Sequence, residues 1–165
     1  MTRTSRAGTV TGTVTGTEPV PQQNVAIARW EGGWRARVSV GATDAPEGDG
    51  RTTEPNGFEL LVDEPAWVEG GTGTGPQPTD YLMASIASCY ALAVTWAARR
   101  RGVELPDLVV RATGTYDGPR FSRLLLTVAS TLPAEQLTPL LEPARRACYV
   151  SNTIALAPPI EIELG

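Results

Sequence analysis

The chain has 165 residues, which is enough for one domain that buries a core without metals or disulfide bonds. Its formal net charge is -4, and all 14 basic residues are arginines, a balance that argues against nucleic-acid binding. Histidine and lysine are both absent, so the commonest general base, the commonest metal ligand and Schiff-base chemistry are excluded. Two cysteines without histidine cannot complete a tetrahedral metal site, and we expect no metal and no bound cofactor.

The first 22 residues are rich in threonine and glycine and contain no lasting apolar periodicity. We expect a mobile N-terminal tail over residues 1–22, followed by one domain over residues 23–165. The tail has no apolar run of the length a signal peptide needs, so a reducing, cytoplasmic location is expected. Two cysteines in that setting are more often reactive or simply buried than joined as a structural bridge.

The first predicted elements are strands. Residues 25–30 and 34–40 alternate apolar and polar side chains and are separated by Glu31-Gly32-Gly33, which predicts a β-hairpin. A long surface loop is expected over residues 41–56, and a third strand over residues 57–62.

A long helix is predicted over residues 80–101, with Thr79 as N-cap, Asp80 in the first turn and arginines in the last turn. Residues 81–98 carry no charge, so a membrane span has to be weighed. Small and hydroxylated side chains dilute the hydrophobicity of the segment, and the flanking strands need a sheet to join. We therefore expect a core helix, with no membrane contact.

The second half predicts a hairpin over residues 108–116 and 121–131, then a helical region over residues 133–148. Pro139 and Pro143 should not both fit inside one regular helix, so a turn followed by a helix from about Glu142 is expected. Residues 158–164 (PPIEIEL) alternate and predict a last strand. This order predicts an α+β domain rich in antiparallel strands.

Cys89 lies about ten residues into the predicted helix, hence ~15 Å from its N-terminus, where the helix dipole cannot activate a thiol. A reactive Cys89 would need a cation from another element: Arg35, Arg37, Arg51 or Arg145. The alternative is that Cys89 is an ordinary buried residue. The residues alone leave both possibilities open.

Two segments add information. GPQPTDYLMASIASCYALAV resembles the segment of the OsmC and organic hydroperoxide resistance superfamily in which a Gly-rich loop and a proline precede a long helix bearing the first cysteine. ARRACYVSNTI is similar to the second-cysteine motif of that superfamily, and the likeness covers roughly residues 23–164. It implies an OsmC-like fold with a long central helix and a second helix, in an intertwined homodimer.

The resemblance also implies roles for individual residues. Cys89 would attack the peroxide, Cys148 would resolve the sulfenic acid as a disulfide, and an external thiol or a dihydrolipoyl protein would act as reductant. An arginine of an N-terminal loop would assist, for which Arg51 is our choice. Three features depart from the family pattern. Asp80, our candidate for orienting the arginine, stands one residue later than the family's glutamate; Tyr149 replaces a proline; and the loop at 41–56 is too divergent to align the arginine.

The hypothesis that follows is a thiol-dependent peroxidase acting on small organic hydroperoxides, with Leu82, Ile86 and Tyr90 as the apolar wall of the substrate site. The alternative is a non-catalytic module that binds a small apolar ligand or senses redox state. A third possibility is that both thiols are inert core residues. We expect a homodimer, because one chain cannot plausibly cover a long uncharged helix by itself.

Overall fold

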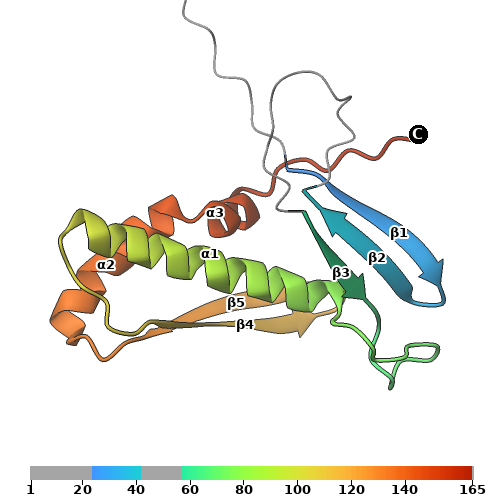
Figure 1. The fold of residues 1–165 in the computed structure, drawn as a ribbon, viewed down its shortest axis with the longest axis horizontal. Coiled ribbons are helices and arrows are strands. Elements are labelled where there is room, and N and C mark those ends of the chain that lie inside the picture. The colour runs from blue at the N-terminus through green and yellow to red at the C-terminus, as the bar shows by residue number, and fades with distance from the viewer. Residues whose placement is uncertain (1–23, 42–56, 165) are drawn as a thin grey trace, which may run out of the picture.

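The computed structural model describes residues 24–41 and 57–164. The predicted tail at 1–22, and all but the first residue of the predicted loop at 41–56, lie outside the described residues. The described chain is α+β, with the three-stranded sheet at one end of the molecule and the helices together with the β4–β5 hairpin in the rest (Figure 1).

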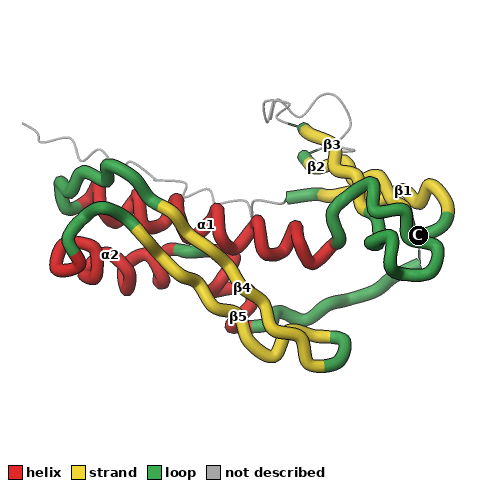
Figure 2. The backbone as a smooth tube through the Cα atoms, turned by 90° about the horizontal axis from the view of Figure 1, so that it is seen from below, coloured by secondary structure: helices red, strands yellow, loops and turns green. Residues whose placement is uncertain are grey.

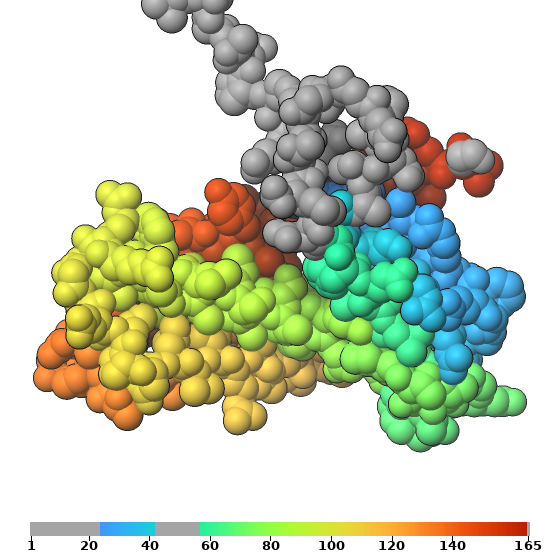
Figure 3. Space-filling model, in the orientation of Figure 1, coloured from blue at the N-terminus to red at the C-terminus, as the bar shows by residue number. Residues whose placement is uncertain are grey.

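The predicted N-terminal hairpin and third strand are confirmed. Strands β1 (Ala26–Gly32), β2 (Arg35–Val40) and β3 (Phe58–Val62) form an antiparallel sheet in that order. Gly32 and Gly33 adopt φ of 109° and 57° at the β1–β2 turn, a conformation that glycine reaches without steric cost. The sheet forms a separate lobe beside the start of the long helix (Figure 3).

The second predicted hairpin is also confirmed, as β4 (Val109–Asp117) and β5 (Arg120–Ala129). The Tyr116 and Phe121 rings meet across the pair with their centroids 4.5 Å apart. A Cβ atom at Gly114 would lie 2.4 Å from the Phe121 ring, so this position needs glycine. The hairpin runs along the long helix for much of its length (Figure 2).

Helix α1 spans Pro78–Arg100 and begins two residues earlier than predicted. Thr79 is not its N-cap; Gln77 is, with Pro78 at the first helical position, where its fixed φ suits a helix start. Asp80 accepts a hydrogen bond from the Gln77 backbone N–H at 3.0 Å, which completes a capping box.

By length and composition, α1 could cross a membrane, but core helices of soluble proteins pass the same test. Its contacts are those of a core helix, because it packs against α2 (Ala134–Ala147), β4 and α3 (Tyr149–Leu156). Side chains of α1, α2 and the residue between α2 and α3 form the main buried cluster: Tyr90, Ala93, Val94, Ala97, Ala98, Leu140, Ala144 and Cys148.

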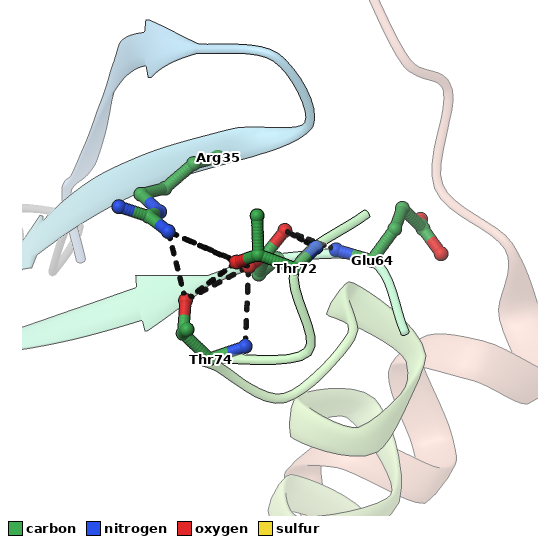
Figure 4. A network of polar contacts seen from close by, with 5 residues as sticks. Arg35, Glu64, Thr72 and Thr74 are labelled. Atoms are coloured by element: carbon green, nitrogen blue, oxygen red, sulfur yellow. Dashed lines mark hydrogen bonds and ion pairs between the residues drawn. The ribbon is translucent and has the colours of Figure 1, made fainter. Parts of the chain in front are cut away.

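A buried carboxylate fastens the three-stranded sheet to the loop that leads into α1. Asp63, at the end of β3, accepts hydrogen bonds from the backbone N–H of Glu64 at 2.8 Å and from the hydroxyls of Thr72 and Thr74. The Arg35 guanidinium donates to both threonine hydroxyls at 2.9 and 3.0 Å (Figure 4). The Thr72 hydroxyl, aided by further donors from both threonines and opposed by desolvation, holds the Asp63 pKa well below its usual range.

The prediction for the two prolines was wrong, because α2 contains both Pro139 and Pro143. Pro143 has no N–H to give to the carbonyl of Pro139, and the Arg101 guanidinium donates to that carbonyl instead. Arg101 therefore does more than end α1 in solvent. It supplies the donor that the second proline removes.

The predicted last strand is also absent among the described residues. Residues 157–164 have no ladder partner there and run from α3 toward the end that carries the three-stranded sheet (Figures 1 and 2). Ile160 and Ile162 are 88% and 92% exposed. Alternation fits a half-buried strand, but it does not supply the neighbouring strand that such a segment needs.

Arg101→Ala should lower the free energy of unfolding by about 1 kcal/mol, because it leaves the Pro139 carbonyl without its donor. In a Pro143→Ala background the same change should cost less, since an alanine N–H can reach that carbonyl. Urea denaturation of the four proteins measures both losses, with Arg99→Ala as the matched control at the same helix end. Equal losses in the two backgrounds would contradict this explanation.

Candidate active site

Cys148 occupies the junction between α2 and α3, as the N-cap residue of α3. Its backbone is extended there (φ -79°, ψ 106°), and its side chain is fully buried. The Asn152 backbone N–H donates to the Cys148 carbonyl at 3.1 Å, and the Asn152 side-chain amide donates to the Arg146 carbonyl at 2.9 Å. These bonds fix the turn that points Cys148 into the core.

Cys89 lies in the middle of α1, is partly buried, and packs against the cluster that contains Cys148. The structure therefore brings together the two cysteines, both as free thiols. A partly exposed thiol beside a fully buried one is an arrangement that can form a disulfide after oxidation.

The environment of Cys148 favours its ionised form. Burial acts to raise the pKa of Cys148, but hydrogen bonds from the Ser151 side chain and backbone, from the Cys89 thiol and from the Val150 backbone outweigh it, and the pKa is lowered. For neighbouring Tyr90, burial first and the Cys148 charge second raise the pKa.

A cavity of about 870 Å³ opens at Cys89, between α1 and the α2–α3 segment. The α1 side chains that line it beyond Cys89 are Leu92, Ala93 and Trp96, at the spacing of one helix face. Among the described residues of the lining, Arg146 is the only charged one, and it pairs with Glu142 at 3.2 Å. The remaining lining residues are Ala147, Tyr149, Asn152, Thr153, Leu156 and Pro158.

The residues predicted to wall the substrate site do not line the cavity at Cys89. Ile86 and Tyr90 line a second cavity, of about 400 Å³, and Leu82 lines neither cavity. Helical spacing does not explain this difference, because Leu82 and Ile86 stand seven and three residues before Cys89, whereas Leu92 and Trp96 stand three and seven residues after it. The cavity opens on the C-terminal side of Cys89, and Leu92 and Trp96 were not predicted.

Of the arginines predicted as partners of Cys89, none that the structure describes lines the cavity at Cys89. Arg51 lies outside the described residues. Arg35 is engaged in the Asp63 network, and Arg37 pairs with Glu31 at 2.7 Å. Arg145 makes two hydrogen bonds to Glu142 and lines the second cavity rather than the one at Cys89.

Asp80 stands nine residues before Cys89, or about 13 Å along the helix. Its carboxylate is bonded to the backbone of Gln77, so the contact that the structure shows is a helix cap. Its role in orienting an arginine stays a prediction. Within the described ranges, no group of three His, Cys, Asp or Glu side chains could hold a metal ion.

Comparison with known protein families identifies one family whose model matches this chain. The sequence model of the family described as OsmC-like protein matches residues 71–163, a segment that contains both cysteines. No curated protein matches the chain.

Several solved structures share the fold. One from Psychrobacter arcticus, named as a candidate osmotic stress induced and detoxification response protein, is 19% identical with a TM-score of 0.61, covering 81% of this chain and 90% of that one. A candidate organic hydroperoxide resistance protein of Vibrio cholerae, with captopril in one active site, is 25% identical with a TM-score of 0.55, covering 82% and 86%. An organic hydroperoxide resistance protein of Bacillus subtilis is 20% identical with a TM-score of 0.54, covering 80% and 90%.

Arg146→Ala should slow modification of Cys89 by an anionic alkylating reagent about threefold to tenfold, because it removes a cation of the cavity lining that attracts the reagent. Arg145→Ala is the matched control, because Arg145 also pairs with Glu142 but lines the other cavity. Rates of alkylation of native protein, with the modified peptide identified by mass spectrometry, provide the measurement. Equal slowing in both variants would assign the effect to general charge instead.

Proposed function

Because the chain belongs to the OsmC-like protein family, we propose that it is a thiol-dependent peroxidase that reduces organic hydroperoxides through Cys89 and Cys148. The observation that carries this proposal is the pairing of the two thiols, one partly exposed at a cavity and the other buried behind it. Structural neighbours named for organic hydroperoxide resistance support it.

The proposed cycle has three steps. The Cys89 thiolate attacks one peroxide oxygen, the O–O bond breaks, and the alkoxide leaves and is protonated to the alcohol. Cys89 is now a sulfenic acid, and the Cys148 thiolate attacks its sulfur while hydroxide leaves and takes up a proton as water. An external thiol or a dihydrolipoyl protein then reduces the disulfide, so the cycle uses no bound cofactor.

The cavity lining favours an organic substrate. Leu92 is 72% exposed and Trp96 is 45% exposed, both on the face of α1 that carries Cys89. Burying an alkyl group against such side chains is worth roughly 25 cal/mol per Å² of apolar surface removed from water. Hydrogen peroxide has no alkyl group to bury and gains nothing from this wall.

A second candidate function is a non-catalytic module that binds a small apolar ligand or senses redox state through the same cysteines. The Asp80 carboxylate favours it, because the structure engages this group in the helix cap. Tyr149, which is 84% exposed where the superfamily pattern has proline, is a further difference at the second cysteine. Turnover separates this module from a peroxidase, because a sensor is oxidised once and consumes no excess peroxide.

The proposal includes a homodimer in a reducing, cytoplasmic setting. Apolar side chains are exposed along the C-terminal segment, at Ile160, Ile162 and Leu164, and on α1 and α3 at Leu92 and Leu156. Monomeric soluble proteins seldom leave so much apolar surface in water, and a second copy of the chain would cover it.

Cys89→Ser should abolish consumption of cumene hydroperoxide, whereas Cys148→Ser should react once and stop with an oxidised Cys89. Wild-type protein treated with one equivalent of peroxide should lose two hydrogens and yield a Cys89–Cys148 crosslink within one chain, detected by peptide mapping. Turnover with a dithiol reductant should be faster for cumene hydroperoxide than for hydrogen peroxide, for the reason given by the cavity lining.

If two free thiols remain after peroxide treatment, the two-cysteine cycle is wrong, and the non-catalytic binding module becomes the better explanation. Equal turnover of the two peroxides would instead leave the cycle standing and contradict only the role of the apolar wall.

Light scattering at micromolar concentration should give twice the mass of the 17.5 kDa chain. Deletion of residues 159–165 should weaken this dimer, because it removes three exposed apolar side chains that a second copy would cover. A single-chain mass for the intact protein would overturn the homodimer.

A further inference from the structure

The second cavity is separate from the cavity at Cys89. Neither Cys89 nor Cys148 lines it, and its walls come from α1, β5, α2 and α3. On α3, Ile154 and Ala155 line the second cavity, whereas Leu156 lines the one at Cys89. Helix α3 therefore contributes a wall to each cavity. At about 400 Å³, the second cavity has the size of a small-molecule site.

Most of the second cavity is lined by apolar side chains from three elements. Ile86 of α1 is only 4% exposed, and Leu124 and Leu126 of β5 are half-buried. The two leucines stand two residues apart on a strand, so they point to the same face. Ile154 adds an exposed apolar side chain from α3. An alkyl chain that covered these side chains would gain from the apolar surface removed from water.

The neutral polar side chains of the lining are already bonded to the backbone. The Tyr90 hydroxyl donates to the Leu141 carbonyl at 3.0 Å, the Ser151 hydroxyl to the Cys148 carbonyl at 3.2 Å, and the Asn152 amide to the Arg146 carbonyl at 2.9 Å. A ligand with many polar groups would therefore find few donors here. The lining suits a ligand whose body is apolar.

Arg145 is the only charged side chain in the described part of this lining. Its Nε and Nη2 atoms donate to the Glu142 carboxylate at 2.8 and 2.9 Å, and its Nη1 atom has no acceptor among the described residues. The same carboxylate accepts a hydrogen bond from Arg146 at 3.2 Å, so two guanidinium groups share one anion. These three side chains keep one net positive charge, and Nη1 of Arg145 can donate to a further anion.

We propose that the second cavity binds a small aliphatic monocarboxylate, with its alkyl chain against Leu124, Leu126 and Ile154 and its carboxylate on Nη1 of Arg145. A phosphate ester carries more charge and would leave oxygens without donors in this lining. The site goes beyond the proposed peroxidase, because it uses neither cysteine. The exposed apolar side chains Leu92 and Leu156, which we assign to the homodimer contact, line the other cavity.

The first test compares two probes on the intact protein. Protein labelled with ¹⁵N is titrated with sodium octanoate and with octanamide, which has the same chain without the charge, and the backbone amide signals are followed by NMR. Octanoate should shift the signals of Leu124, Leu126 and Ile154 and leave those of Leu92 and Trp96 in place. Octanamide should bind about tenfold more weakly, because it lacks the charge-assisted hydrogen bond.

The second test uses substitutions in the charged group. Arg145→Gln should weaken octanoate binding about tenfold. Arg146→Gln is the matched control, because Arg146 also pairs with Glu142 but lines the other cavity, and it should change the affinity by less than about threefold. Glu142→Gln should strengthen binding about threefold, because it removes the anion that competes for Arg145.

The third test changes the apolar wall. Leu124→Asp should weaken octanoate binding about tenfold or more, because it places a second carboxylate beside the alkyl chain. Leu125→Asp is the matched control, since Leu125 is the next residue of β5, is 41% exposed and lines neither cavity. Unchanged amide signals in the three-stranded sheet show that each variant is folded.

The proposal is overturned if octanoate shifts no signals, if octanamide binds equally well, or if the shifts are confined to Leu92 and Trp96. Equal losses in Arg145→Gln and Arg146→Gln would also overturn it. None of these measurements uses peroxide, so a protein that consumes no peroxide would contradict the proposed function and still give a decisive result for this site.

Discussion

Close contact between α1 and α2 is the constraint on which the site depends, and small side chains make it possible. Ala93, Ala97 and Ala98 of α1 and Ala144 of α2 are all buried in one cluster, where larger residues would hold the helices apart. This contact seats Cys148 against the middle of α1. It also directs α3 back along α1, so that the cavity at Cys89 acquires its second wall.

Elements specified by neighbouring residues could be predicted from the sequence, and those specified by distant partners could not. The hairpin at Gly32-Gly33 and the long helix have local signals, and both were found. The path of α2 through Pro143 depends on Arg101, a donor 38 residues before Pro139, which no local rule reveals. The alternation of residues 158–164 suits a strand, but whether a strand forms depends on a sheet edge beside it, and no described strand pairs with it.

In the candidate site, the two cysteines could be predicted from the sequence, whereas the cavity wall could not. Sequence similarity pointed to Cys89 and Cys148, and the fold places them together. Because α1 is apolar on both sides of Cys89, the sequence could not show at which of its ends the cavity opens, and Leu82, Ile86 and Tyr90 were predicted whereas Leu92 and Trp96 were not. Helix α3 was not predicted, so the sequence did not show that Cys148 stands at the junction of two helices.

The two thiols also constrain each other, because neighbouring groups of like charge do not readily ionise together. Attack on peroxide requires a thiolate on Cys89, whereas resolution of the sulfenic acid requires a thiolate on Cys148. In the proposed cycle these two charges are needed in different steps, and Cys89 is a neutral sulfenic acid when Cys148 reacts. The pair therefore never has to hold both negative charges at once.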